Sequence, residues 1–434
     1  MYITQCIIAK NEEDNIGYCL SHLKSVADEQ IVVDTGSNDR TVEVAKELGA
    51  KLFHFDWIDD FSAARNYALE KAKGDWIIFL DCDEYFSDAS ISMIRERIKR
   101  IHGNRNINGI KTELINIDKD KNVLSTTQNI SPRIFRNRKS IRYKNKIHEY
   151  LIDTKNIKNQ YAVICIDDND IKIMHTGYDK NIARGKNKKE RNVSMLKKEL
   201  DENPTDSHLN LYVSNSLYLN QQYSEALHYA LQALKYMDSN KRLDYYPTIY
   251  SSILYSMHAL SSTLDEMKSI FDKAISKYPE YPDYYGAMGL AALNDGDAKE
   301  AIRYLEECIY YCNNYSSGIE SLALGQIEKL YNELLKAYII EDNKPKIVEL
   351  SVALLKADKY DYENLTVLII TLLSQEKEEA IIEFLSKIYD YNSFKDKIYL
   401  FKSGEVSKNE KLIEYYYSLF NEEELKTLES SQEI

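Results

Sequence analysis

The feature that most constrains the fold is a short apolar run followed directly by acidic residues. Residues 76–80 have no polar side chain on either face, which is typical of a strand buried on both sides in a parallel sheet. Asp81 and Asp83 follow where this strand leaves the sheet, and open α/β sheets bind ligands at that edge. Two carboxylates spaced in this way can share a hard cation such as Mg²⁺ or Mn²⁺, which in turn can hold a diphosphate. We therefore expect a metal-held nucleotide diphosphate whose attached group is transferred.

Strand-like and helix-like segments alternate through the first 102 residues, which predicts a Rossmann-like, mostly parallel α/β sheet. The chain has no G-x-G-x-x-G motif, which argues against a dinucleotide site. Beyond residue 102, turns rich in Asn, Asp and Lys separate short strand-like segments and predict a smaller mixed-sheet portion. The expected strands are 2–9, 30–34, 51–55, 76–80, 109–117, 123–128, 133–135 and 161–166. The first expected helix follows the turn at 10–13 and ends near 26; the others are 41–48, 61–72 (with Ser62 as a cap) and 90–102.

From about residue 184 onward the pattern changes to helices, beginning with a charged connecting helix at 184–203. Aligning Ala226 with Ala301 also aligns Ser214 with Gly289 and Ala230 with Leu305, the small and apolar positions of a tetratricopeptide repeat of ~34 residues. Residues 243–278 would form a degenerate repeat between them. We expect an α/β domain at 1–183 and a tetratricopeptide-like α-solenoid at 184–434. The expected helix pairs are 207–220 with 224–237 and 282–293 with 299–311.

Composition excludes several function classes. The formal net charge of −13 argues against a nucleic-acid-binding surface as the main function. The six Cys show no paired framework, and 44% hydrophobic residues fit a folded, cored protein. No secretory signal is visible, and the apolar run 365–373 is far shorter than the ~20 residues that span a bilayer. A cytoplasmic protein is expected.

Several motifs in the first half occur in the order found in one enzyme family. They are I-I-A-K-N-E-E (7–13), I-V-V-D-T-G-S-N-D-R-T (31–41) and D-x-D (81–83). They resemble those of the family 2 glycosyltransferases, which have the GT-A fold. A narrower branch, which includes lipopolysaccharide-core-type transferases and bacteriocin S-glycosyltransferases with tetratricopeptide tails, is suggested by W-I-D-D-F-S-A-A-R-N (57–66), R-I-F-R (133–136), I-H-E (147–149) and H-T-G-Y (175–178).

The resemblance implies roles for the acidic residues. Asp34 resembles the carboxylate that accepts a hydrogen bond from the nucleotide base; the alternative is a loop carboxylate that caps the helix at Thr41. Asp81 corresponds to the residue on the ribose and metal side, and Asp83 to the direct metal ligand. His175 stands where a further metal ligand is expected, with a purely structural histidine as the alternative. Asn11, Glu12 and Asp60 fall in motifs of the same nucleotide-sugar site.

The resemblance also implies an inverting transfer with a carboxylate base. Glu149 is the candidate base and His148 the second candidate; alternatively, this pair only contacts Arg142 or Lys146. The planar guanidinium groups of three arginines are candidates to face diphosphate oxygens, although ordinary salt bridges would explain at least one of them. These arginines are Arg65, Arg133 and Arg136.

The expected donor is a UDP-sugar, UDP-glucose or UDP-GlcNAc, held with Mg²⁺ or Mn²⁺. A solenoid fused to a transferase suggests that the helical domain binds a peptide or protein acceptor, modified at Cys or Ser, such as a bacteriocin precursor. The solenoid would equally support a homodimer, which leaves a saccharide or lipid-linked acceptor of cell-envelope synthesis open. Two hypotheses of a different class are a tetratricopeptide adaptor with an inactive transferase domain and a nucleotidyltransferase.

Overall fold

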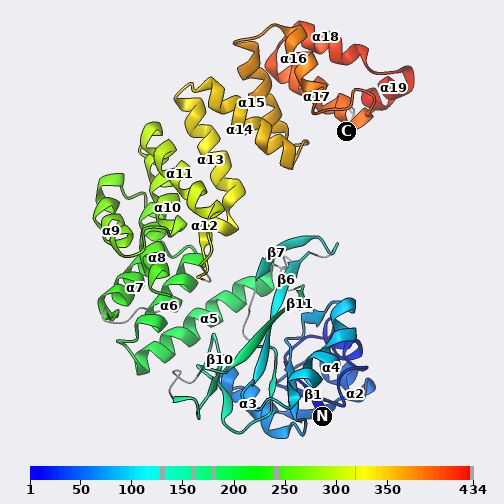
Figure 1. The fold of residues 1–434 in the computed structure, drawn as a ribbon, viewed down its shortest axis with the longest axis vertical. Helices are drawn as coiled ribbons and strands as arrows, with labels where there is room; N and C mark the ends of the chain where they lie inside the picture. Colours follow the sequence, from blue (N-terminus) through cyan, green and yellow to red (C-terminus); the bar gives the residue numbers. More distant parts are fainter. Residues whose placement is uncertain are drawn as a thin grey trace. The chain divides into compact units, whose positions relative to one another are not determined.

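The structure is a computed structural model that describes residues 1–118, 120–127, 132–157, 162–176, 182–238, 245–317 and 319–430. Contacts divide the chain into two compact units, Met1–Gln221 and Gln222–Ile434. The first unit contains sheets and helices, and the secondary-structure elements described in the second unit are helices (Figure 1). The predicted order, α/β followed by all-α, is confirmed. Helices α5 (Ile182–Glu202) and α6 (Ser207–Leu219) group with the first unit, whereas the sequence placed the boundary after residue 183.

The main sheet begins with four parallel strands in the order β3-β2-β1-β4. Trp76 and Ile78 of β4 belong to the core on one face of the sheet, and Ile77 and Phe79 belong to the core on the other. The apolar run is therefore buried on both faces, as predicted. These strands are β1 (Ile3–Ala9), β2 (Glu29–Asp34), β3 (Lys51–His54) and β4 (Trp76–Phe79).

The sheet continues as a mixed sheet beyond β4. Strand β8 (Ile134–Arg136) is antiparallel to β4, and the order then runs through β6 (Gly109–Ile117), β11 (Cys165–His175) and β5 (Glu84–Phe86). A mixed portion was predicted, and it continues the parallel strands into one mixed sheet. Strand β11 begins later than the predicted segment 161–166, whose first residue lies outside the described part of the chain. The remaining strands are β7 (Val123–Thr127), which pairs with β6, and the separate pair β9 (Ile141–Lys144) and β10 (Tyr150–Asp153).

The helices of the first unit follow the predicted order. Asp60, rather than Ser62, caps α3, because its carboxylate accepts a hydrogen bond from the backbone N of Ala63 at 2.8 Å. The Ser62 hydroxyl instead donates to the backbone O of Asn145. These helices are α1 (Ile16–His22), α2 (Thr41–Glu47), α3 (Phe61–Lys71) and α4 (Asp88–His102), followed by α5 and α6.

The second unit is a series of helix pairs (Figure 1). Ala226 and Ala301, the aligned repeat positions, are both fully buried. A Cβ atom added at Gly289 would lie 2.7 Å from Leu305 Cγ, so glycine allows the close approach of α10 to α11. Helices α8 and α9 occupy the predicted degenerate repeat. The helices are α7 (Tyr223–Tyr236), α8 (Tyr246–Ala259), α9 (Leu264–Lys277), α10 (Pro282–Asn294), α11 (Ala298–Asn313), α12 (Leu322–Gly325), α13 (Ile327–Ile340), α14 (Lys344–Ala357), α15 (Tyr362–Leu373), α16 (Glu378–Leu385), α17 (Phe394–Ser407), α18 (Glu410–Ser418) and α19 (Glu422–Ser430).

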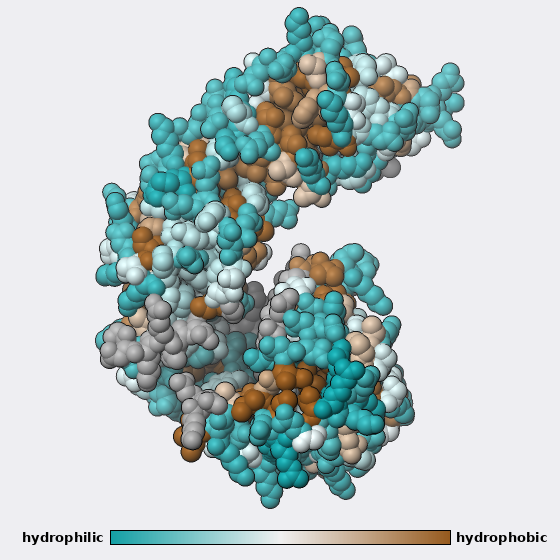
Figure 2. Space-filling view, in the orientation of Figure 1, coloured by the Kyte–Doolittle hydropathy of each residue, from teal (hydrophilic) through white to brown (hydrophobic). Residues whose placement is uncertain are grey.

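Hydrophilic residues cover most of the visible surface (Figure 2), as expected for a chain with 29% charged residues. Among the described residues, no helix combines the length and the apolar character needed to cross a bilayer.

Candidate active site

The carboxyl ends of the parallel strands bring the predicted site residues to one edge of the main sheet. Ala9 lies beside Asp34 in the register of β1 and β2, and Cys6 lies beside Phe79 in that of β1 and β4. The loops that follow these strands therefore start at the same edge, where open α/β sheets bind ligands. Asp34 is the last residue of β2, and the loops carry Asn11, Glu12 and Asp81.

Two other strands extend this edge. The backbone N of Phe79 donates to the backbone O of Arg133 at 2.8 Å, which places Arg133 beside the end of β4. His175 ends β11, where it pairs with Glu84 of β5 and Asn116 of β6. Acidic and basic side chains from distant parts of the sequence are thus collected at one edge.

Asp34 is held by its own loop. Its carboxylate accepts hydrogen bonds from the backbone N atoms of Gly36 (3.1 Å) and Ser37 (3.0 Å). The alternative role as a cap at Thr41 is not observed, because the backbone N and hydroxyl of Thr41 donate to Asp39. A carboxylate has about four lone-pair sites. Asp34 therefore retains the capacity to accept a further hydrogen bond.

Asn11 and Glu12 connect the first loop to the second. The side-chain O of Asn11 accepts a hydrogen bond from the backbone N of Asn38 at 2.9 Å, and the backbone N of Glu12 donates to the Thr41 hydroxyl at 2.7 Å. Asn11 has a φ of 57°, in the left-handed region that asparagine tolerates better than most residues. These two residues therefore hold the loop after β1 against the loop after β2, at the sheet edge where they were predicted to lie.

Arg65 lies between two of the predicted functional carboxylates. Its Nε donates to Glu149 at 2.7 Å, and its Nη2 donates to Asp81 at 2.8 Å. The side chain is only 7% exposed, and its guanidinium packs over the rings of Phe79 and Tyr143. The alternative partners of Glu149, Arg142 and Lys146, are not observed.

The charges around Asp81 determine its protonation. Burial raises the pKa of this carboxyl, but the guanidinium groups of Arg65 and Arg133 outweigh burial and hold the pKa at about 2. Asp81 is therefore ionised at neutral pH.

Arg133 forms a two-bond ion pair with a carboxylate that the sequence analysis did not assign. Its Nε and Nη2 donate to Glu84 at 2.9 and 2.6 Å, and Nη2 lies 3.9 Å from Asp81. Glu84 is 3% exposed. Arg133 thus lies at the predicted edge, and Nε and Nη2 of its guanidinium group are both bonded to the Glu84 carboxylate.

Asp83 and His175 form the second pair of acidic and basic groups. His175 Nε2 lies 3.4 Å from a carboxylate O of Asp83, and its Nδ1 lies 2.7 Å from the amide O of Asn116. Burial lowers the pKa of His175, but the hydrogen bond to Asp83 and the nearby negative charges outweigh burial and raise the pKa above its ordinary value. Among the described residues, no group of three or more His, Cys, Asp or Glu could hold a metal ion. The predicted set of Asp81, Asp83 and His175 is therefore not assembled as one cluster.

Arg136 lies away from this edge, and the prediction that it faces a diphosphate is wrong. Its register partner is Trp76, at the start of β4 rather than the end. Its guanidinium donates to the backbone O atoms of Ile101 and His102, at the end of α4, and of Ile107 in the segment that follows. Arg136 is therefore a structural residue that satisfies carbonyls at a helix terminus.

His148 precedes the candidate base in a strained position. Its φ is 52°, and its ring stacks on Tyr212 of α6, with centroids 4.3 Å apart. Tyr212 in turn lies 4.3 Å from the ring of His208, measured between centroids. This stack links the loop of Glu149 to α6. Gly177 and Tyr178 of the H-T-G-Y motif lie outside the described residues.

Three residues that contact the predicted site residues were not predicted: Glu84, Asn116 and Tyr212. Glu84 directly follows the D-x-D motif and was visible as a third acidic residue. Asn116 lies near the end of a correctly predicted strand, but its pairing with β11 was needed to place it beside His175. Tyr212 carries no local signal, because its contact with His148 joins residues that are distant in the sequence.

One protein-family model matches the part of the chain that contains most of the site residues. Residues 4–152 match the model of glycosyl transferase family 2. Residues 4–152 form a family 2 glycosyltransferase domain. Asp34, Asp81, Asp83, Arg65, Arg133 and Glu149 lie in the glycosyltransferase domain, and His175 lies beyond its matched range.

Relatives with similar sequences include glycosyltransferases and a repeat protein. The chain is 29% identical over 279 residues to a TPR repeat-containing protein of Synechococcus elongatus, with 64% of each chain covered. It is 26% identical over 234 residues to the SPbeta prophage-derived glycosyltransferase SunS of Bacillus subtilis, with 54% of this chain and 53% of SunS covered. An uncharacterized glycosyltransferase of Rickettsia typhi is 39% identical over 85 residues, which cover 20% of this chain and 29% of that protein. The chain thus spans about half to two thirds of the length of the first two relatives.

Solved structures give a weaker likeness. Glucosyl-3-phosphoglycerate synthase of Mycobacterium tuberculosis, solved with Mn²⁺ and UDP, matches with a TM-score of 0.23 and 22% identity over 26% of this chain and 44% of that chain. A score this low supports no conclusion about the ligands of this chain.

Proposed function

We propose that this protein is an inverting, metal-dependent glycosyltransferase that moves a sugar from a UDP-sugar to a side chain of a peptide or protein. The main support is the convergence of ion-paired acidic and basic residues at the carboxyl edge of the sheet, within a family 2 glycosyltransferase domain. Arg65 connects Asp81 to Glu149 within this group, so the donor side and the candidate base belong to one network.

The chemistry of Asp83 and His175 fits a divalent cation. With Nδ1–H donating to the amide O of Asn116, a neutral His175 directs the lone pair of Nε2 toward the Asp83 carboxylate. Two acceptors that face each other need a proton or a metal ion between them. Sites of this kind complete their coordination with phosphate oxygens and water. When bound, the cation would neutralise charge that develops on the leaving diphosphate.

The residues of this chain then have distinct roles. Asp34 accepts a hydrogen bond from the base of the nucleotide, and Asp81 lies on the ribose side. Arg133 supplies positive charge next to the diphosphate. Glu149, oriented by Arg65, takes the proton of the acceptor, with His148 as the alternative base.

The acceptor is proposed to be the thiol or hydroxyl of a Cys or Ser side chain. A thiol needs less help from a base than a hydroxyl because its pKa is lower. The helical second unit supports a polypeptide acceptor, since helix pairs in series offer an extended binding surface. The alternative is a saccharide or lipid-linked acceptor.

Calorimetric titration of the full chain with UDP, with and without Mn²⁺, tests the donor site. We expect binding that requires the metal and that Asp83→Ala abolishes, because one of two proposed protein ligands is lost. Asp88→Ala is the matched control, since the side chain of Asp88 is 97% exposed in the first turn of α4. Equal binding without metal, or unchanged binding by Asp83→Ala, would contradict the proposal. Mass spectrometry of peptides and saccharides incubated with a panel of UDP-sugars then identifies the acceptor: a sugar added to Cys or Ser of a peptide supports the proposal, and transfer only to saccharides contradicts it.

A further inference from the structure

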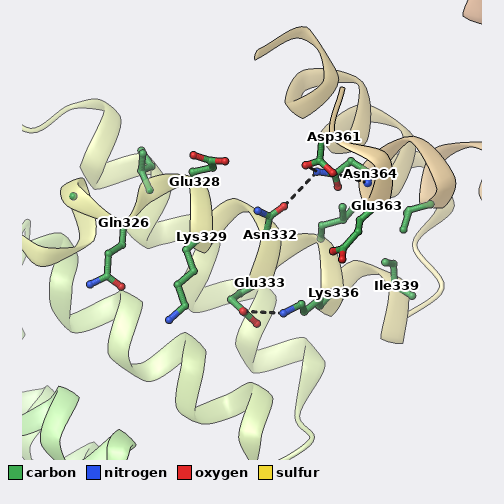
Figure 3. Close-up of a pocket in the computed structure, with 14 residues that line it drawn as sticks. Gln326, Glu328, Lys329, Asn332, Glu333, Lys336, Ile339, Asp361, Glu363 and Asn364 are labelled. Carbon is green, nitrogen blue, oxygen red and sulfur yellow. Dashed lines mark hydrogen bonds and ion pairs between the residues drawn. The ribbon is translucent and has the colours of Figure 1, made fainter. Parts of the chain in front are cut away.

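The second unit contains a polar groove that no comparison assigns. It has a volume of about 690 Å³ and lies between α13 and α15, with the end of α12 at its border (Figure 3). Such a volume lies in the range of ligand sites in proteins. The side chains of Ile327, Leu335, Ile339 and Val367 supply its apolar part.

Two asparagines in this groove form a hydrogen-bonded pair. Asn364 Nδ2 donates to the Asp361 carboxylate and, at 3.4 Å, to Asn332 Oδ1 (Figure 3). A carboxylate only accepts hydrogen bonds, so the amide nitrogen of Asn364 must face Asp361. This contact fixes the orientation of both amides, because Asn332 must then present its oxygen to Asn364.

The pair leaves one donor and one acceptor unused. Among the residues that the structure describes, the amide nitrogen of Asn332 and the amide oxygen of Asn364 have no hydrogen-bond partner. Asn364 is only 4% exposed, but its amide oxygen is not fully buried and is accessible from the groove. A donor next to an acceptor is the complement of a peptide group, which offers one C=O and one N–H.

The charges of the groove favour a basic partner. Its lining contains four carboxylates and two lysines. Lys336 pairs with Glu333 at 2.9 Å, whereas Glu328, Glu363 and Lys329 form no ion pair with any described residue, so the lining keeps a net negative charge. Carboxylates without partners attract cations and repel acidic chains.

We propose that this groove binds an extended, lysine- or arginine-containing peptide segment by its main chain, with the Asn332–Asn364 pair holding one peptide group. The unpaired carboxylates select basic side chains on either side of that group. This inference is independent of the proposed transferase activity, because binding needs neither a sugar donor nor a metal ion.

Fluorescence anisotropy of the full chain, without donor or metal, tests the proposal. The probe is a fluorescein-labelled peptide of about twelve residues in which Lys and Ser alternate. We expect binding that weakens about tenfold when the backbone amides of the peptide are N-methylated, because the peptide then loses its N–H donors at unchanged charge. A peptide in which Glu replaces Lys should bind at least about tenfold more weakly.

Variants of the chain locate the site. Asn332→Ala should weaken binding of both probes about tenfold, because it removes the donor to a peptide C=O that N-methylation leaves in place. Asn294→Ala, at the end of α10 and outside the groove lining, should change neither. Glu328→Gln with Glu363→Gln alters exposed residues only and should reduce the preference for Lys over Glu. Equal binding of the methylated and unmethylated peptides would overturn the inference. It would show that only non-specific electrostatic attraction, and no hydrogen bond to the peptide main chain, holds the probe. Unchanged affinity in the Asn332 variant would also overturn it.

Discussion

Arg65 shows how one side chain can couple two functional groups. Its guanidinium is buried against two aromatic rings and forms ion pairs with Asp81 and Glu149. A buried charge is tolerated only when its hydrogen-bonding capacity is used, and here two carboxylates use it. Removal of the guanidinium would leave both carboxylates with less compensation and would raise the pKa of Asp81 from about 2 toward its ordinary range.

We expect Arg65→Gln to lower the free energy of unfolding of the first unit by about 3 kcal/mol, because it breaks a buried ion-pair network. Urea unfolding followed by tryptophan fluorescence measures this, since Trp57 and Trp76 are the two tryptophans of the chain and both lie in the first unit. Arg100→Gln is the control: Arg100 is 60% exposed and pairs with Glu96 on one helix, so a change within about 0.5 kcal/mol is expected. Equal effects of the two substitutions would show that burial of Arg65 does not matter to stability.

Which arginine reaches the site was decided by strand pairing. Arg133 and Arg136 are three residues apart in one motif, and the same role, facing the diphosphate, was predicted for both. An extended chain rises about 3.3 Å per residue, so three residues separate the two by about 10 Å along the strand. Antiparallel pairing places one beside Phe79, at the site, and the other beside Trp76, at the far end of β4.

At the scale of elements, a buried carboxylate connects helices of the second unit. Asp396 of α17 is fully buried, and its carboxylate accepts hydrogen bonds from Lys359 Nζ (2.8 Å), the Tyr360 hydroxyl (2.8 Å) and the backbone N of Asp390 (2.9 Å). Burial raises the pKa of this carboxyl, but these hydrogen bonds and the charge of Lys359 outweigh burial and lower the pKa below its ordinary value.

This lowered pKa predicts a pH dependence of stability. The folded state binds the proton of Asp396 more weakly than the unfolded state, so its contribution is fully present above the ordinary aspartate pKa of about 3.9. It is lost as the pH falls through the lowered pKa. Hydrogen exchange of the α17 amides between about pH 5 and 2.5 measures this, after correction for the intrinsic exchange rate. We expect protection to fall with pH in the wild type and to be lower, with a flatter pH dependence, in Asp396→Asn.

The control for this experiment is Asp272→Asn, which changes an exposed residue of α9. It should leave both the protection of α17 and its pH dependence unchanged. If Asp396→Asn kept the steep pH dependence of the wild type, other carboxyl groups would be responsible for it.

Elements with strong local patterns were predicted well, whereas three of the short strands were not. Strand β6 was predicted at 109–117 and observed at Gly109–Ile117, because nine residues rich in β-branched side chains carry a clear signal. Strands β5, β9 and β10, of three or four residues, were missed. Segments of this length contain too few residues for periodicity to appear, and partner strands stabilise them instead.

At the scale of the whole molecule, the boundary between the units depends on contacts that join distant residues. Lys198 of α5 pairs with Asp59 at 2.7 Å, and Glu202 pairs with Lys146 at 2.7 Å. Tyr212 of α6 stacks on His148. Both helices therefore support the loops that carry Asp60 and Glu149, although their helical sequence groups them with the repeats that follow.

Two truncated chains test this boundary. We expect residues 1–221 to give a cooperative unfolding transition by tryptophan fluorescence and to keep metal-dependent UDP binding. We expect residues 1–183 to unfold at a lower urea concentration, because the cut removes the partners of Asp59, Lys146 and His148 and exposes apolar surface. Equal stability of the two truncated chains would instead support a boundary at residue 183.

The sequence alone determined the alternation of strands and helices, the buried strand β4, the acidic turn after it and the change to helix pairs. These features depend on local propensity and on periods of two and 3.6 residues, which each segment carries by itself. Only the tertiary structure decided that Arg65 links Asp81 to Glu149, that Glu84 engages Arg133 and that α5 and α6 support the first unit. Such contacts join residues up to about 140 positions apart, as in the Asp59–Lys198 pair, and no local pattern records them.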